Sequence, residues 1–178
     1  QKSVRGSDPD AAIHYLARLI DGGADEMMIG RRLMVMASED IGMAYPNAIS
    51  IVTSCVQAAQ MIGFPEAQIP LAEATILMAS CPKSNRANEA LNAALADLHS
   101  RKIDDVPAHL MDSHYGGAAK LGRGQGYKYP HAYGGYVTQQ YLPDNLYREG
   151  VRYYEPTDNG NEGAFKNYLE KLREIDRK

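Results

Sequence analysis

Apolar residues recur at helical spacing through the first hundred positions of the chain, and capping residues, glycines and prolines divide them into segments. The pattern predicts five helices, at residues 8–21, 26–41, 46–63, 70–81 and 84–101. Because the linkers between them are only a few residues long, consecutive helices are expected to lie antiparallel. The sequence therefore predicts an all-α fold, an antiparallel helical bundle.

Particular side chains mark where these helices begin. Ser7 is expected to cap the first helix, with Pro9 in its first turn, and Ser84 is expected to cap the fifth. The fifth helix has an apolar stripe with helical spacing, which consists of Ala87, Leu91, Ala94, Leu95 and Leu98.

The region after residue 105 is rich in tyrosine. Ten of the twelve tyrosines lie at or beyond Tyr115. We interpret residues 105–156 as a largely irregular extension, which its tyrosines fasten to the helical part. Short strands, which could form a β-hairpin, are predicted at 136–141 and 151–154, and a charged helix is predicted at 162–177.

The composition is that of a globular protein. The chain has 178 residues, of which 44% are hydrophobic, enough for one compact domain or one and a half small ones. Cys55 and Cys81 fall in apolar helical segments and are expected to be buried, reduced thiols. No apolar run approaches the ~20 residues that cross a bilayer, so we predict a cytoplasmic protein without a membrane partner. The chain starts at Gln1, and we take it as part of a longer protein.

Motifs of catalysis are missing from the sequence. Lys83-Ser84 lacks the glycines of a phosphate-binding loop, and residues 122–126 read G-x-G-x-G without a preceding strand. The histidines form no i, i+4 pair and no Cys-x-x-Cys is present. Glu39 and Asp40 are expected to form an ion pair or a cap, with a metal or general-base role as the alternative. We therefore expect no catalytic, cofactor or metal site.

One glycine-rich loop, residues 120–133, interleaves cations with aromatic rings, and we call it the tyrosine loop. Its cations are Lys120, Arg123 and Lys128, and the nearest rings are Tyr127 and Tyr129. Single-stranded nucleic acid or a nucleotide phosphate would bind to cations beside stackable rings. The alternative is that the tyrosines pin the loop to the core while the lysines stay in water. The net charge of −3 argues against a dedicated nucleic-acid-binding domain but allows such a local patch.

Six strings in fixed order resemble one family, and they lie at residues 2–12, 31–33, 37–42, 82–85, 124–130 and 140–143. Over roughly residues 2–156 the chain resembles the C-terminal part of the replication-associated recombination protein A family of AAA+ ATPases. That family is also called MgsA, and its eukaryotic relative is the Werner helicase-interacting protein. Such long strings in order are far more specific than a single glycine pattern.

The resemblance implies how a longer protein would be organised. Residues 1–44 would end the helical lid segment of an AAA+ module, and residues 45–178 would form an oligomerisation domain similar to the collar of clamp loaders. ATP and Mg would bind to a preceding ATPase module, so nothing catalytic transfers to this chain. The resemblance also implies a homotetramer, with DNA and single-stranded DNA-binding protein as partners of the whole protein. Candidate structural or interface residues in the matching strings are Arg31, Arg32, Glu39, Asp40, Lys83 and Asn85.

Two features depart from the family pattern. Tyr45 stands where the family usually has an aspartate cap, so Asn47 is expected to cap the third helix, and no family pattern is recognisable after Pro156.

Our main hypothesis is a non-catalytic oligomerisation and scaffold domain that serves DNA replication, recombination and repair. Methionine side chains adapt to irregular interfaces. The hypothesis is therefore supported by five methionines in the helical part, Met27, Met28, Met34, Met36 and Met43. The alternative is a module that binds single-stranded DNA or a replication protein through the tyrosine loop.

Overall fold

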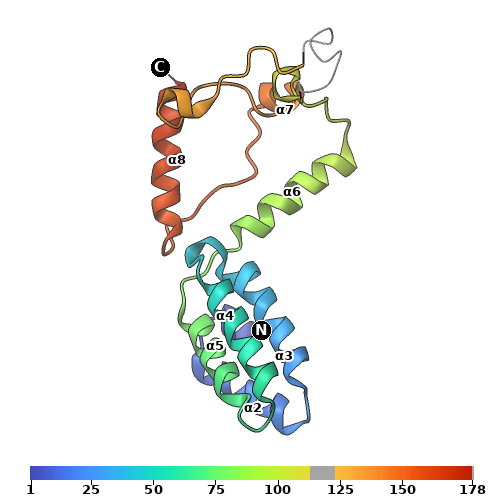
Figure 1. Ribbon diagram of the computed structural model, residues 1–178, viewed down its shortest axis with the longest axis vertical. Helices are drawn as coiled ribbons and strands as arrows, with labels where there is room; N and C mark the ends of the chain where they lie inside the picture. Colours follow the sequence, from blue (N-terminus) through green and yellow to red (C-terminus); the bar gives the residue numbers. More distant parts are fainter. Residues whose placement is uncertain (113–122, 178) are drawn as a thin grey trace. The chain divides into compact units, whose positions relative to one another are not determined.

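The computed structural model describes residues 1–112 and 123–177, which form two compact units (Figure 1). The first unit comprises Gln1–Ala90 and Tyr154–Asn167, and the second comprises Leu91–Tyr153 and the chain from Tyr168 onward. Regular structure in the described residues is helical throughout, without a strand. The predicted all-α class is therefore confirmed.

Five helices build the first unit. They are α1 (Lys2–Arg5), α2 (Pro9–Asp21), α3 (Glu26–Met36), α4 (Ala48–Ile62) and α5 (Gln68–Ser80). α5 lies at the centre and packs against each of the other four, while α3 also packs along α4. Between α3 and α4 the chain forms a π-helical turn, η1 (Ala37–Ile41), and a short 3-10 turn, η2 (Gly42–Ala44).

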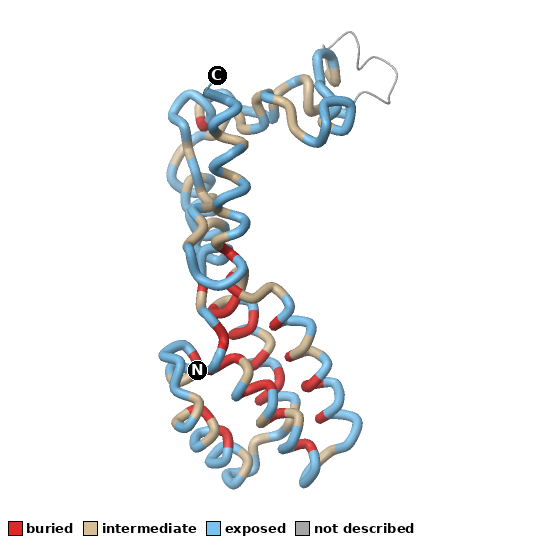
Figure 2. Tube along the Cα trace, turned by 90° about the vertical axis from the view of Figure 1, so that its left-hand side faces the viewer, coloured by how far each residue is buried: buried red, intermediate tan, exposed pale blue. Residues whose placement is uncertain are grey.

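The hydrophobic core lies between these helices (Figure 2). Leu71 and Met78 of α5 and Val52 of α4 are fully buried, as is Ile41 in the π-helical turn. Gly30 permits close approach of α3 to α4, because a Cβ there would lie 2.4 Å from a methyl carbon of Val56. Ile29, Leu33, Met36 and Ala37, which recur at helical spacing in the second predicted helix, are buried.

Helix ends differ from the predictions at three positions. Asp8 caps α2 by accepting a hydrogen bond from the backbone of Ala11, whereas Ser7 precedes the cap with a positive φ of 58°. Asn47 occupies the N-cap position of α4 but its side chain makes no capping hydrogen bond. Helix α5 begins two residues before Pro70, because proline is tolerated in a first turn, where backbone N–H groups have no helical partner.

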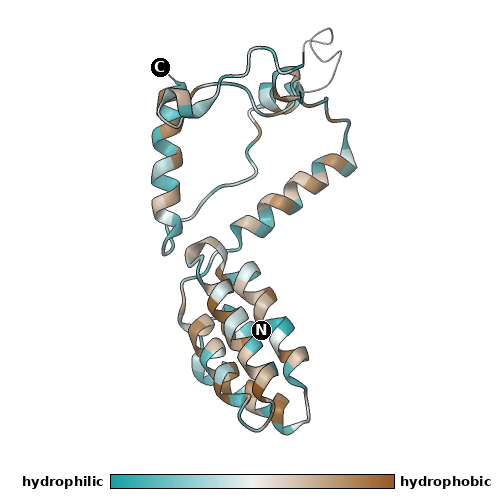
Figure 3. Ribbon diagram, viewed as in Figure 1, coloured by the Kyte–Doolittle hydropathy of each residue, from teal (hydrophilic) through white to brown (hydrophobic). Residues whose placement is uncertain are grey.

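Helix α6 (Arg86–Ser100) forms as predicted but buries none of its residues. Ser84 lies two residues before the helix, one position earlier than a cap, and its Oγ accepts a hydrogen bond from the backbone N–H of Arg86 over 3.3 Å. Figure 3 shows apolar residues recurring along α6. Four of the five predicted helices therefore contribute buried side chains to the core of the first unit, and the fifth does not.

The second unit is largely irregular. It contains the 3-10 turns η3 (Ala108–Leu110) and η5 (Pro130–Tyr133) and the short helix α7 (Asp144–Glu149). Helix α8 (Glu162–Asp176) confirms the predicted C-terminal helix, and its first residues belong to the other unit.

The strands predicted at 136–141 and 151–154 are wrong. Neither segment lies beside a partner strand, and side-chain hydrogen bonds to helices hold both in place. Tyr136 and Thr138 donate to Asp176 of α8 over 2.5 and 2.7 Å, and Tyr153 donates to Asp97 of α6 over 2.6 Å. Both segments are thus irregular chain fastened to helices.

Residue 44, the expected end of the lid segment, lies inside the first unit. Helices α3 and α4, on either side of it, share one core. The division of the chain at 44/45 concerns the organisation of a longer protein and stays a prediction. In the described residues no helix is long and apolar enough to span a membrane.

Candidate interaction surfaces

Several strings that carry the family resemblance meet at one polar junction in the first unit. Nε of Arg5 in α1 donates to Oδ1 of Asp40 in the π-helical turn over 2.6 Å. This hydrogen bond and the charge of Asp40 raise the pKa of Arg5. Asp40 is only 5% exposed, and its Oδ2 has no hydrogen-bond partner in the described part of the chain. The acidic group thus forms the ion pair expected of it.

Lys83 ties the same junction to the N-terminal segment. Its Nζ donates to Oγ of Ser7 over 2.9 Å and to the carbonyl of Cys81 over 2.5 Å, and burial lowers its pKa. The backbone N–H of Ser84 donates to the carbonyl of Asp40 over 2.9 Å. A cleft of about 470 Å³ opens here, and among its lining residues are Glu39, Asp40, Lys83 and Asn85. Four of the candidate interface residues therefore lie together.

A carboxylate that the sequence analysis missed completes the junction. Glu162, the first residue of α8, is fully buried and accepts hydrogen bonds from Tyr154 over 2.9 Å and Thr157 over 2.5 Å. Burial alone would raise the pKa of Glu162, but hydrogen bonds from Ser84, Thr157 and Tyr154 together hold it below its ordinary value. The sequence offered only an acid at a helix start, which the helix dipole explains without burial.

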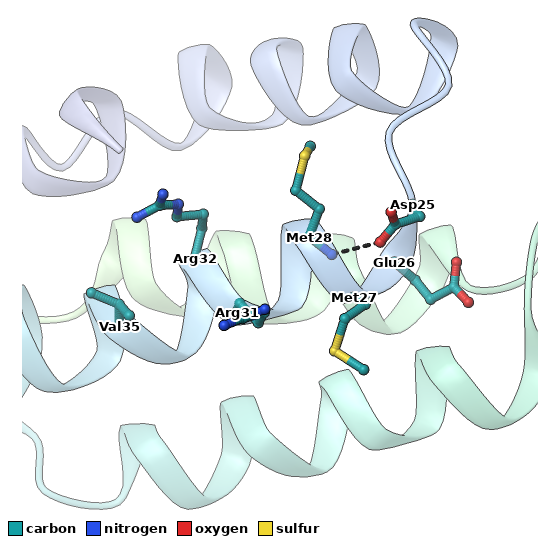
Figure 4. A pocket seen from close by; sticks show the side chains of 7 residues that line it. All are labelled: Asp25, Glu26, Met27, Met28, Arg31, Arg32 and Val35. Atoms are coloured by element: carbon teal, nitrogen blue, oxygen red, sulfur yellow. Dashed lines mark hydrogen bonds between the residues drawn. The ribbon is translucent and has the colours of Figure 1, made fainter.

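The other two candidate interface residues, Arg31 and Arg32, lie on the open surface of α3 (Figure 4). Neither forms a salt bridge with the described residues. Met27, Met28 and Val35 lie beside them and are each about half exposed. In Figure 4, Met28 and Arg32 point from α3 toward α2, whereas Met27 points toward α4.

The tyrosine loop is described from Arg123 onward, and Lys120 lies outside the described residues. Tyr127 and Tyr129 expose 45% and 59% of their surface. The side chain of Gln139 accepts a hydrogen bond from the backbone N–H of Lys128 and donates one to the carbonyl of Lys128. The Nζ of Lys128 lies 3.4 Å from the carbonyl of Thr138. The rings nearest the cations are thus turned outward.

Other tyrosines do fasten the irregular segments. Tyr136 and Tyr153 of the second unit donate to Asp176 and Asp97, and burial with the bond to Asp176 raises the pKa of Tyr136 to about 12. Tyrosines outside the tyrosine loop therefore fasten the irregular segments, whereas a binding role for Tyr127 and Tyr129 stays a prediction.

The second unit has little core of its own. Among its described residues only Leu146 is a buried hydrophobic. The stripe of α6 in this unit, Leu91, Leu95 and Leu98, is 60%, 42% and 61% exposed, and we call it the leucine stripe. Polar contacts hold the unit instead. Arg101, for example, forms salt bridges with both Asp97 and Glu149. The described residues of the second unit therefore leave these apolar side chains uncovered.

Chemistry-bearing clusters are sparse. Within residues 1–112 and 123–177, no three His, Cys, Asp or Glu side chains are arranged to hold a metal ion. Cys55 and Cys81 are buried free thiols, and burial raises the pKa of both.

A family model described as the MgsA AAA+ ATPase C terminal matches residues 6–173. The chain belongs to this family. It is 55% identical over 174 residues to Replication-associated recombination protein A of Bacillus subtilis, covering 97% of this chain and 41% of that protein. It is 53% identical over 178 residues to an AAA domain-containing protein of Mycobacterium tuberculosis, covering 99% and 39%. ATPase WRNIP1 of Dictyostelium discoideum is 32% identical over 158 residues, covering 88% and 18%.

Membership in the MgsA C-terminal family confirms the resemblance and extends it. The match continues beyond Pro156 to residue 173, so most of α8 belongs to the family pattern, including the buried Glu162. The chain spans about two fifths of the length of the bacillar and mycobacterial relatives. What it matches is the C-terminal part of an AAA+ ATPase.

Proposed function

We propose that this chain is the non-catalytic oligomerisation and scaffold domain of an AAA+ ATPase that acts in DNA replication, recombination and repair. The ATP and Mg sites belong to an ATPase module outside this chain. The assignment to this cellular process is supported by the name of the Bacillus subtilis relative, Replication-associated recombination protein A.

The observation that carries the proposal is the uncovered apolar surface of the second unit. Helix α6 is amphipathic, yet its leucine stripe is about half exposed or more, and Leu146 is the unit's only buried hydrophobic in the described residues. An isolated helix of this length is marginal in water, because burial of an apolar face supplies most helical stability. A second copy of the chain would supply that burial, and closed homo-oligomers, such as the homotetramer expected from the family, are the usual result.

The five methionines differ in exposure. Met36 is buried, Met34 and Met43 are half-buried, and only Met27 and Met28 are exposed. Among the methionines only Met27 and Met28 therefore support the proposal, and its main support is the leucine stripe.

The test replaces Leu91, Leu95 and Leu98 together by glutamine and measures sedimentation over a concentration series. The wild-type chain is expected to sediment above its monomer mass of 19.6 kDa, and the triple variant as a monomer. Ala93→Gln is the matched control, because residue 93 is exposed and lies two positions from Leu91, off the stripe. Equal association of the wild type and the triple variant would refute the role of the stripe.

A second candidate function is binding of single-stranded DNA or a replication protein, such as single-stranded DNA-binding protein, through the tyrosine loop. It is favoured by the exposure of Tyr127 and Tyr129 beside Lys128, since outward rings next to a cation suit stacked bases and phosphate.

Replacing Lys120, Arg123 and Lys128 by alanine tests this function. Affinity for a single strand should fall, and the log–log salt slope should flatten by roughly 0.7 for each phosphate that the variant no longer neutralises, about 2 in all. Lys171→Ala on α8 is the control for the removal of a surface charge. Unchanged affinity in the triple variant would exclude the loop as the binding site.

A further inference from the structure

A groove in the first unit runs between α2 and α3. Both helices pack on α5, and the groove between them has a volume of about 340 Å³. Its floor is apolar and buried, formed by residues such as Leu16, Leu33 and Met36. Its rim is apolar but exposed, since Leu19 of α2 and Met28 of α3 each expose 47% of their surface, and Figure 4 shows Met28 directed toward α2. The described residues of the first unit therefore leave this groove open.

The start of the chain lies in the same groove. Gln1, Ser3 and Val4 are among its lining residues, and Val4 is only 3% exposed. The next residue, Arg5, is tied to Asp40, which lies beyond the end of α3 and outside the groove lining. Followed upstream from Arg5 to Gln1, helix α1 therefore runs from that end of α3 into the groove. Any chain that precedes Gln1 thus starts inside the groove.

Helix α1 begins without a capping side chain. It has only four residues, and the side chain of its N-cap residue, Gln1, makes no capping hydrogen bond. By contrast, the side chains of Asp8 and Asp25 cap α2 and α3, each by accepting a hydrogen bond from a backbone N–H. A helix of one turn is far shorter than one that is stable in water, and the N–H groups of a first turn need acceptors. Residues upstream of Gln1 would supply those acceptors by continuing the helix.

The relatives carry further chain on this side. The Bacillus subtilis protein is matched over 41% of its length, and the family is described as the C terminal of an AAA+ ATPase. The greater part of that protein therefore lies ahead of the region that this chain matches. A covalently attached segment is present at a high effective concentration, whereas a separate molecule has to be recruited from solution. Connectivity therefore favours the upstream chain as the occupant of the groove.

We propose that helix α1 continues upstream of Gln1 in the longer protein and that this continuation fills the groove between α2 and α3. The inference rests on the proposed place of this chain behind an ATPase module. The α3 side of the groove, from Met28 to Met36, is about 12 Å long at 1.5 Å per residue, so about eight residues of helix with an apolar inward face cover it. The ATPase module is then joined to the first unit by a packed helix and not by a free linker.

Cysteine labelling in the full-length protein tests whether the groove is covered. Leu19→Cys and Met28→Cys place thiols on the rim, and Met61→Cys on α4 is the matched control, because Met61 is 88% exposed and lies outside the groove. The unsubstituted protein gives the background from the buried Cys55 and Cys81. In the 178-residue chain all three introduced thiols should react quickly with a maleimide. In the full-length protein the two groove thiols should react at least about tenfold more slowly, because a covered thiol reacts only when the contact opens, while Met61→Cys keeps its rate.

A proline at position 2 tests whether the cover is a continuation of α1. Lys2 is exposed and is the first residue of the helix, where proline is tolerated because the N–H that it removes has no helical partner. In a helix that continues upstream, the same proline removes a hydrogen bond and clashes with the preceding turn. Lys2→Pro should therefore leave the 178-residue chain folded by circular dichroism, but in the full-length protein it should raise the labelling rate of Leu19→Cys toward that of the 178-residue chain. Lys2→Ala is the control and should leave that rate low.

Three results would overturn the inference. Groove thiols that react as fast in the full-length protein as in the 178-residue chain show that the groove stays open. Protection that survives Lys2→Pro shows that something other than a continued α1 covers the groove. Protection that is lost when the full-length protein also carries Leu91→Gln, Leu95→Gln and Leu98→Gln assigns the cover to a second copy. Sedimentation of the wild-type chain tests the proposed function separately, and a monomer there leaves the labelling results unaffected.

Discussion

At the scale of single residues, the polar junction of the first unit depends on a few side chains with no substitute. Asp40 has Arg5 as its ion-pair partner, and Glu162 is buried with hydroxyl donors on three sides. Removal of the partners of a buried carboxylate leaves a buried charge uncompensated, which lowers the free energy of unfolding.

Because of Glu162, the free energy of unfolding should depend on pH in the acid range. Its pKa is lowered in the folded chain, so its contribution is present above the ordinary glutamate value and is lost as pH falls through the lower folded value. Denaturant unfolding of the wild type should therefore show a falling free energy of unfolding below about pH 4.5. Glu162→Gln should remove part of that decrease, whereas Glu170→Gln at an exposed position should not. Identical pH profiles for the wild type and Glu162→Gln would contradict this role.

Gly42 is the second residue whose replacement gives a sharp result. Its φ is +47°, and a Cβ would lie 2.7 Å from the carbonyl oxygen of Ser84. Gly42→Ala should cost roughly 2 kcal/mol or more in unfolding free energy, from backbone strain plus a clash with rigid backbone. Gly134→Ala shares the positive φ but meets nothing within 4 Å, so it should cost only about 1 kcal/mol. Equal costs would mean that the clash is relieved.

At the scale of elements, the helices were predictable because their periodicity and their stop signals are local. Gly22 and Gly63 end α2 and α4 as their positions indicated, and the stripe of α3 is buried. Local pattern misled at 136–141, because tyrosine and β-branched residues such as Val137 suit contact with a helix as well as with a strand. The sequence pattern could not reveal that the leucine stripe of α6 is exposed. Amphipathic spacing is the same whether the apolar face packs against its own chain or against another copy.

The candidate site was predictable only in part for a similar reason. The strings around Asp40 and Lys83 stood out as sequence, and the structure brings them together. Glu162 did not stand out, because its burial depends on donors that the fold delivers from Ser84 and Tyr154.

Hydrogen exchange should separate α6 from α5. Amides of α6 are expected to exchange quickly at low protein concentration and to gain protection as copies associate, because association covers the helix. Amides in the middle of α5, which lies in the core of the first unit, should keep the same protection throughout and serve as the internal control. Slow exchange in α6 at the lowest concentration would show that a single copy already stabilises it.

At the scale of the whole molecule, the two units differ in what holds them. The first has a contiguous core around α5, and the second has one buried hydrophobic residue in its described part and a network of polar contacts. Apolar burial is the main favourable term in folding, so the second unit has most to gain from another copy.

Sedimentation velocity of the unmodified chain at tens of micromolar is the decisive measurement of self-association. Association through the uncovered apolar surface predicts species heavier than 19.6 kDa whose fraction grows with concentration. A single species of 19.6 kDa across the whole range would contradict it.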